Sequence, residues 1–282
     1  MKTLTLLLLS VSLLSAETIH SSLSSYFETK DYDGSKQKKD AVVYGVGADI
    51  HVDKSAFKAT YEYARANTRT PPLKHDLKNA KLFLKYAYHI DDRFEVNINY
   101  INVLHDNIAI TDDGQVMGAG ITYNLSKKIS ANFTQFYSNY DDFDVYQSDL
   151  QVDFKFKLAD IGFKLSSITK YINIDEENTN SFTKNAKSDY FTSGLKLHAN
   201  YNSYLLGAGF YVGKRAFGVM QDGFKLQHHA MEFDRTYAVA LGKSIEQLVL
   251  RVQYVYQRAE ELPIENKDVK VKTLRFIANY KF

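Results

Sequence analysis

The chain has 282 residues, with 35 Lys and Arg against 33 Asp and Glu and a formal net charge of +2. So small an excess provides no basic field for a phosphate backbone, which argues against nucleic acid as a partner. There is no Cys, which excludes disulfides and cysteine-based metal sites. The 21 Tyr and 18 Phe, with only 3 Pro, indicate an ordered, aromatic-rich domain.

The N-terminus has the pattern of a secretory signal peptide. A basic start at Lys2 precedes an apolar run from Leu4 to Leu14, and a small residue, Ala16, follows. An N-terminal membrane anchor is the alternative, but the run is too short to cross about 30 Å of hydrocarbon. We therefore expect a signal peptide over 1–16 and an exported domain over 17–282.

The exported domain alternates apolar and polar residues almost throughout. In one segment Leu150, Val152, Phe154, Phe156 and Leu158 alternate with polar residues. Successive side chains of a strand point to opposite faces, so this pattern predicts strands with one apolar face. The predicted strands are 18–29, 41–53, 56–66, 79–90, 93–103, 114–125, 128–138, 147–158, 160–172, 188–199, 203–213, 230–241, 247–260 and 268–282. Most are long enough to cross a membrane when tilted.

The connections alternate between short turns and longer loops. The longer ones are predicted at 30–40, 67–78, 104–113, 139–146, 173–187, 214–229 and 261–267. This alternation is typical of a transmembrane antiparallel up-and-down β-barrel with both termini at the short-turn end. We expect an all-β barrel of about 14 strands, with 12–16 left open. Loops 173–187 and 214–229 are the two long enough to fold across its mouth.

A secreted β-sandwich is the alternative fold, but its strands would be shorter and less uniform. Aromatic residues of the apolar face also gather near both strand ends, among them Tyr88 and Phe94 at one end and Tyr63 and Tyr137 at the other. Two such belts match the interfacial girdles of a membrane barrel. The aromatic pattern therefore favours the barrel.

The last strand carries Leu274, Phe276, Ala278, Tyr280 and a terminal Phe282. This pattern resembles the C-terminal signature of bacterial outer-membrane β-barrels. The resemblance implies the outer membrane of a Gram-negative bacterium, contact with its lipid, and the barrel-assembly machinery as a partner during biogenesis. The strand number and length resemble the small fourteen-stranded monomeric porins, which implies a monomer that passes small hydrophilic solutes without a cofactor.

The polar face of such a barrel lines the lumen. The predicted pore-lining residues are Asp49, His51, Lys58, Glu62, Lys81, Lys85, His89, Glu95, Asp153, Lys155, Lys157, Lys164, Lys196, His198, Glu232, Asp234, Arg251, Arg275 and Lys281. They comprise ten cations, six anions and three histidines. A dry core could not hold these charges without pairing nearly all of them, so we expect water in the lumen and a channel on the order of 10 Å across, unless loops or long Lys and Arg side chains plug it.

The predicted excess of positive charge has two interpretations. The lysines are either solvated and balanced by nearby acids, or they give the pore a weak anion preference. The histidines would add charge near pH 6.5. We expect no metal site and no cofactor.

An enzyme on the same scaffold is the alternative from another class. A barrel lipase needs a Ser with a His in reach, and His20-Ser21-Ser22 is the sole His-x-Ser sequence. A barrel protease would use loop acids and a His, for which Asp112-Asp113, Asp141-Asp142 and His228-His229 are candidates. Neither pattern is specific, so we predict a non-enzymatic porin. A closed structural or adhesive barrel is the remaining alternative.

Overall fold

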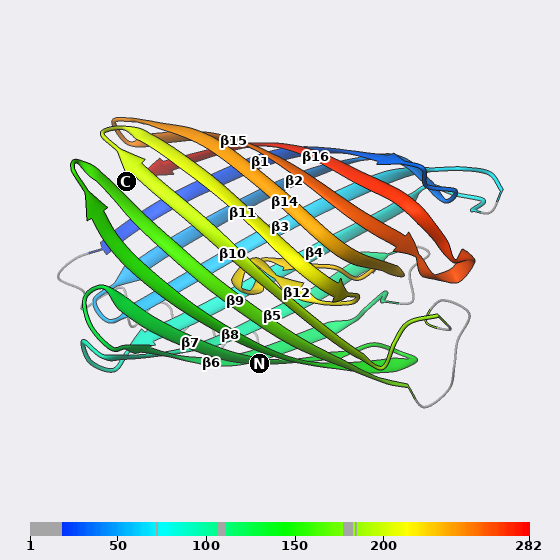
Figure 1. Cartoon of the computed structure of the whole chain (residues 1–282), viewed down its shortest axis with the longest axis horizontal. Coiled ribbons are helices and arrows are strands. Elements are labelled where there is room, and N and C mark those ends of the chain that lie inside the picture. Colours follow the sequence, from blue (N-terminus) through cyan, green and yellow to red (C-terminus); the bar gives the residue numbers. More distant parts are fainter. Residues whose placement is uncertain (1–18, 72, 107–110, 177–182, 184) are drawn as a thin grey trace.

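The computed structural model describes residues 19–71, 73–106, 111–176, 183 and 185–282. These residues form a closed antiparallel barrel of fourteen strands, in which each strand pairs with its neighbours in the chain and β1 pairs with β16 (Figure 1). This confirms the predicted fold and strand number. The predicted signal peptide lies outside the described residues. In the described part of the chain, no helix is long and apolar enough to cross a membrane.

The barrel strands are β1 (Ile19–Asp33), β2 (Lys38–Val52), β3 (Ser55–Thr68), β4 (Leu77–His89), β5 (Phe94–Asp106), β6 (Gln115–Asn124), β7 (Ile129–Asn139), β8 (Phe143–Leu158), β9 (Ile161–Glu176), β10 (Asp189–Tyr201), β11 (Tyr204–Arg215), β14 (Met231–Ile245), β15 (Leu248–Glu261) and β16 (Asn266–Lys281). The short strands β12 (Val219–Met220) and β13 (Lys225–Leu226) form a separate hairpin. Two 3-10 turns, η1 (Gln221–Gly223) and η2 (Leu262–Ile264), complete the described elements.

The two ends of the barrel differ as predicted. One end, called here the short-turn end, has the turns 53–54, 90–93, 125–128, 159–160, 202–203 and 246–247 together with the termini of β1 and β16. The other, the long-loop end, has the remaining seven connections. Several predicted loops are wrong in length, because strands continue into them: 30–40 shrinks to 34–37, 139–146 to 140–142 and 261–267 to 262–265.

Turn residues at the short-turn end match the backbone they must adopt. Asp53 and Asn202 take positive φ angles of 49° and 52°, which Asp and Asn tolerate better than most residues. In turn 90–93 the Asp91 carboxylate accepts hydrogen bonds from the backbone N–H groups of Arg93 (2.7 Å) and Phe94 (2.8 Å). These bonds favour the ionised carboxyl and lower its pKa.

The outer surface is apolar. Leu84, Val152, Leu250 and Phe276 are exposed by 38%, 40%, 43% and 46%, while their sequence neighbours alternate onto the other face. Aromatic side chains meet across neighbouring strands near the ends, as in the pair of Phe94 on β5 and Tyr123 on β6, whose rings are 4.9 Å apart. Exposure of these side chains outside the barrel agrees with the predicted facing.

Residues 216–230, between β11 and β14, fold into the barrel and are called here the lumen hairpin. Figure 1 shows this segment, with β12 labelled, inside the ring of strands. Its residues Ala216, Phe217 and Val219 are at most 1% exposed. Loop 214–229 was expected to be long enough to fold across the mouth, and in the structure most of it lies inside the barrel; the other candidate loop, 173–187, falls partly outside the described residues.

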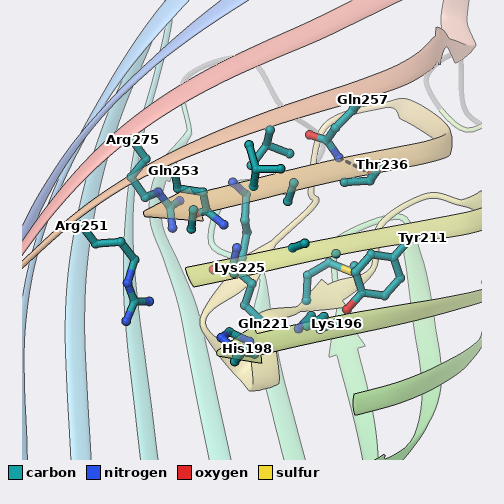
Figure 2. Close-up of a pocket in the computed structure, with 18 of the residues that line it drawn as sticks. Lys196, His198, Tyr211, Gln221, Lys225, Thr236, Arg251, Gln253, Gln257 and Arg275 are labelled. Atoms are coloured by element: carbon teal, nitrogen blue, oxygen red, sulfur yellow. Dashed lines mark hydrogen bonds between the residues drawn. The ribbon is translucent and has the colours of Figure 1, made fainter. Parts of the chain in front are cut away.

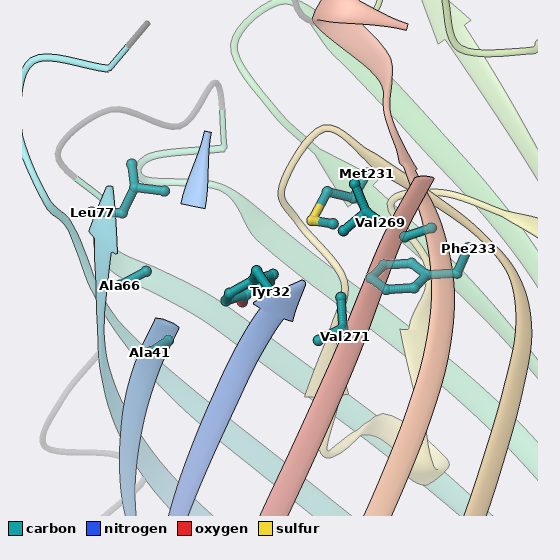
Figure 3. Packing of buried hydrophobic residues seen from close by; sticks show 9 residues of the cluster. Tyr32, Ala41, Ala66, Leu77, Met231, Phe233, Val269 and Val271 are labelled. Atoms are coloured by element: carbon teal, nitrogen blue, oxygen red, sulfur yellow. The ribbon is translucent and has the colours of Figure 1, made fainter. Parts of the chain in front are cut away.

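The lumen is apolar toward the long-loop end. A buried cluster draws Tyr32, Ala41, Ala66, Leu77, Met231, Phe233, Ala259, Val269 and Val271 from seven strands (Figure 3). A second cluster joins Phe217 of the lumen hairpin to wall residues that include Phe143, Ile172 and Tyr190. At this end the lumen is therefore filled by apolar side chains and by the lumen hairpin, so the structure has the plugged arrangement that the sequence left open.

A buried carboxylate joins two loops at the long-loop end. Glu261, which is fully buried, accepts hydrogen bonds from Ser35 Oγ (2.5 Å), from the backbone N–H groups of Lys36 (2.9 Å) and Gln37 (3.1 Å), and from Asn266 Nδ2 (2.8 Å). Hydrogen bonds to a charged acceptor are stronger than neutral ones. Glu261 thus fixes loop 34–37 against the connection between β15 and β16.

Candidate functional site in the lumen

The lumen hairpin packs on one side of the barrel wall. Its Val219, Phe224 and Leu226 contact inward apolar side chains of β4 to β7, among them Phe83 and Ile101. Burial of each such side chain stabilises the docked position by about 1.5–3 kcal/mol. Apolar packing therefore supplies much of the free energy that holds the hairpin inside the barrel.

A side-chain amide fixes the same hairpin by pairing with its backbone. Gln147 on β8 donates from Nε2 to the carbonyl of Val219 (2.8 Å) and accepts from the Val219 N–H at Oε1 (2.8 Å). Both residues are 1% exposed. Because an edge strand in a lumen needs partners for its backbone groups, Gln147 takes the place of a neighbouring strand.

Charged groups of the wall hold the tip of the hairpin. Asp222 pairs with Lys85 of β4 (2.7 Å), and Lys225 lies 3.6 Å from Glu28 of β1. The Lys58 ammonium lies 4.4 Å from the centre of the Phe224 ring, a cation–π contact. The hairpin thus contacts β1, β3 and β4 as well as β8, and it crosses the lumen.

The opposite wall has a patch of very small side chains. Between Tyr211 and Leu205 on β11 and beyond Thr236 on β14, the inward positions are Gly207, Gly209, Ala238, Ala240 and Gly242, and the register pairs Gly207 with Ala240 and Gly209 with Ala238. The small residues leave a cavity of about 280 Å³ between this wall and the lumen hairpin (Figure 2). A smaller cavity of about 80 Å³ shares Lys225, Gln227 and Gln257 with it and extends toward the apolar cluster of Figure 3.

The larger cavity is lined by basic and amide side chains. Its basic residues are Lys196, His198, Arg215, Lys225, Arg251 and Arg275, and its amides are Gln221, Gln227, Gln253 and Gln257. Figure 2 shows most of them converging from the wall strands and the hairpin. Among the described residues, no Asp or Glu lines this cavity. Its lining therefore favours an anion over a cation.

The acids nearest the cavity are all paired with cations. Glu28 pairs with Arg275, Lys30 and Lys225; Asp149 pairs with Lys170; Asp153 pairs with Lys164 at 2.8 Å. In the part of the chain that the structure describes, no carboxylate lies within ion-pairing distance of Arg215, Arg251 or Lys196. These three unpaired cations, together with the excess of cations around Glu28, give the cavity its net positive charge.

Several predicted pore-lining residues are brought together in pairs. Glu62 pairs with Lys81 (2.8 Å), and both are buried. At the short-turn end His51 lies 3.0 Å from Asp49, and His89 lies 3.3 Å from Glu95. Lys155, Lys157 and Lys281 are exposed near the same end. The charged side chains in the middle of the lumen are thus buried in ion pairs, whereas those at the short-turn end are exposed.

A β-bulge disturbs the predicted facing near the long-loop end of β14. The register shifts between Phe233 and Arg235, so strict alternation does not assign a face to Glu232 and Asp234. Glu232 is buried and pairs with Lys214, while Asp234 lies 3.9 Å from Arg258. Neither acid lines the cavity beside the lumen hairpin.

Sequence reasoning missed several charged lumen residues. Glu28 and Lys30 lie in the Ser-rich first strand, and extending its alternation from Ser22 and Ser24 would have placed both inward. Alternation in the eighth predicted strand would likewise have placed Asp149 on the lumen face, and alternation in the ninth would have placed Lys170 there. Arg215 and Lys225 fall in the predicted connection 214–229, where period two gives no signal, although the structure places Arg215 at the end of β11 and Lys225 in β13.

The structure places His20 of the lipase candidate on β1 and His228 of the protease candidate in the lumen hairpin. His20 is exposed at the start of β1, and Ser22 Oγ accepts from Asn279 Nδ2 at 3.2 Å. His228 is buried, with its ring nitrogens 3.0 Å from Thr111 Oγ1 and 3.2 Å from Lys81 Nζ. Within the described ranges no group of three or more His, Asp or Glu is placed to hold a metal. His228 is thus an anchor of the hairpin.

Comparison with known proteins finds no matching family model and no matching curated protein. Solved structures do match. A bacterial polysaccharide outer-membrane secretin gives a TM-score of 0.59 at 11% identity, over 93% of this chain and 98% of that one. The Ralstonia pickettii toluene transporter TbuX gives 0.55 at 10% identity, over 95% and 90%. The Acinetobacter baumannii outer membrane protein Omp33 gives 0.51 at 9% identity, over 93% and 99%. At such identities the likeness shows a shared outer-membrane barrel fold.

Proposed function

We propose that the protein is an outer-membrane channel through which small hydrophilic solutes diffuse passively, without catalysis or a cofactor. The observation that supports it most directly is the cavity of about 280 Å³ left between the lumen hairpin and the small-residue wall of β11 and β14. Exposed apolar side chains around the barrel suit contact with lipid. Export through a cleaved signal peptide, insertion by the barrel-assembly machinery and a monomeric state belong to the same proposal.

The proposed channel prefers anions weakly. Five Lys and Arg residues line the cavity, and no carboxylate does so among the residues described. Fixed charge on a pore wall raises the local concentration of counter-ions within a Debye length, about 10 Å at 0.1 M salt. Lys155, Lys157 and Lys281 add positive charge at the short-turn end. Chloride therefore meets a more favourable potential than potassium along the wall.

Reversal potentials under a potassium chloride gradient test this preference. We expect a chloride permeability above that of potassium at 0.1 M salt. The preference should shrink at 1 M salt, where the Debye length falls to about 3 Å. A preference for potassium at 0.1 M salt would contradict the proposal.

A closed structural barrel is the second candidate, and the apolar clusters at the long-loop end favour it. The cluster of Figure 3 fills inward positions of β1 to β4 and β14 to β16. A closed barrel would keep its fold and show no conductance. The cavity and its basic lining would then be unexplained, which is why we favour a channel.

A further inference from the structure

We propose that the cavity beside the lumen hairpin is a binding site for a small solute that carries an oxyanion, either a carboxylate or a phosphate. The site lies where the lumen is narrowed by the hairpin, so every solute that follows the small-residue wall must pass it. The inference deepens the proposed channel function and rests on it for access. Binding itself requires no conduction.

Two unpaired cations flank the floor of the cavity. Lys196 projects from β10, where it is in register with Gly209 and Ala238, and Arg251 projects from β15, where it is in register with Gly242 (Figure 2). Three strand spacings of about 4.8 Å and an offset of four residues along the strands, at about 3.4 Å each, separate the two backbones by roughly 20 Å. The two long side chains thus enter the cavity at different levels and leave room for a small molecule between their charged ends.

A buried arginine adds charge at the edge of the same cavity. Arg215 is fully buried, and its guanidinium lies 5.6 Å from the ring centres of both Tyr211 and Phe233. One of its nitrogens donates to Thr236 Oγ1, whereas its Nε and Nη1 have no hydrogen-bond partner among the described residues. An uncompensated buried charge is unfavourable, and an anion in the adjoining cavity would compensate it.

Uncharged donors indicate a ligand with further polar groups. Gln253 lies two residues from Arg251 on β15 and pairs in register with Arg275, so these three side chains face the cavity together. Gln221 and Gln227 face it from the hairpin. An arginine fork matches a planar carboxylate or a phosphate, and amides match hydroxyl or carbonyl groups beside it. The lining thus favours a polar organic oxyanion over a simple halide.

The site can be tested by titration calorimetry on the refolded protein in detergent, with three probes. Succinate presents carboxylates, inorganic phosphate presents a phosphate, and succinamide is a neutral molecule close in shape to succinate. We expect saturable binding of succinate or phosphate with a dissociation constant on the order of 1 mM or tighter, and none of succinamide. Which oxyanion binds more tightly identifies the class. Equal binding of succinamide, or no binding of either oxyanion, would overturn the proposal.

Two variants locate the binding, and one serves as a control. Arg251→Gln, exposed in the lumen, and Arg215→Gln should each weaken binding at least tenfold. Arg258→Gln changes the same residue type on β15 outside the cavity and should bind as the unchanged protein does. If Arg215→Gln fails to refold, the binding measured for Arg251→Gln still tests whether the oxyanion binds in this cavity. Unchanged binding by Arg251→Gln would contradict the site, whereas binding without conductance would contradict only the channel.

Discussion

Replacing Gln147 by Leu should weaken docking of the lumen hairpin without removing its apolar packing. In the folded protein the Gln147 amide makes two hydrogen bonds of 2.8 Å with the backbone of Val219. Leucine is similar in size and offers neither a donor nor an acceptor. The Val219 N–H and C=O groups would then be buried without partners whenever the hairpin is docked.

The loss of docking free energy follows from the two hydrogen bonds that Gln147→Leu removes. A buried polar group that loses its partner costs about 1–3 kcal/mol, so two such groups weaken docking by about 2–6 kcal/mol. Since 1.4 kcal/mol corresponds to a factor of ten, even the lower value raises the undocked fraction about thirtyfold. Val219, Phe224 and Leu226 keep their apolar contacts, so the docked state should still predominate.

The absence of Cys from the chain provides the assay. Leu226 is 4% exposed, so the thiol of Leu226→Cys should react with a water-soluble thiol reagent only when the hairpin undocks. The rate of modification then reports the undocked fraction. Adding Gln147→Leu should raise this rate at least thirtyfold at a fixed reagent concentration.

A matched control lies on the same strand. Gln151 faces inward on β8 but bonds to Asp153 Oδ1 (3.0 Å) and not to the hairpin, so Gln151→Leu should leave the rate unchanged. An unchanged rate in Gln147→Leu would refute the idea that this amide holds the hairpin. An equal increase in both variants would show that the change in rate reflects general loosening of β8.

Three further experiments test which residues face the lipid, what holds the loops at the long-loop end, and which end of the barrel faces the outside of the cell. Leu250→Arg places a charge on the lipid-facing surface and should lower the free energy of unfolding in urea by about 2–4 kcal/mol, whereas Arg251→Leu, on the lumen face, should lower it far less; equal losses would contradict the facing. Glu261→Ala removes the acceptor of Ser35 Oγ and of the Lys36 N–H, whereas the Gln37 N–H keeps Ser35 Oγ and Asn266 Nδ2 keeps the Gly34 carbonyl, so it should lower the free energy of unfolding by about 2 kcal/mol or more. Protease added to intact cells should cut at loop 69–76, and cutting at turn 53–54 without lysis would reverse the orientation.

The wall of the barrel was predictable because its facing is set by alternation along each strand. The alternation of successive residues is enough to assign Leu250 and Arg251 to opposite faces, and the structure agrees. This rule fails where the strand pairing is irregular, as at the bulge between Phe233 and Arg235. Some strand ends were predicted wrongly, since inward apolar residues such as Tyr32 lie on β1 beyond its predicted end at residue 29.

The candidate site was less predictable because it depends on contacts between distant segments. The sequence indicates that 214–229 is long enough to enter the lumen, but not that Gln147 would pair with Val219, 72 residues away. Nor does alternation distinguish Gly207 and Ala240, which leave space, from inward residues that fill it. The position of the cavity follows only from the docked hairpin.

Single-channel recording of the refolded protein in a planar bilayer tests the proposed channel most directly. The unchanged protein should show discrete conductance steps. Ala240→Trp, which places a large side chain in the cavity, should reduce them strongly, whereas Ala119→Trp on the outer face of β6 should not. A correctly folded protein without steps, or steps of equal size in Ala240→Trp, would contradict a passage along β11 and β14.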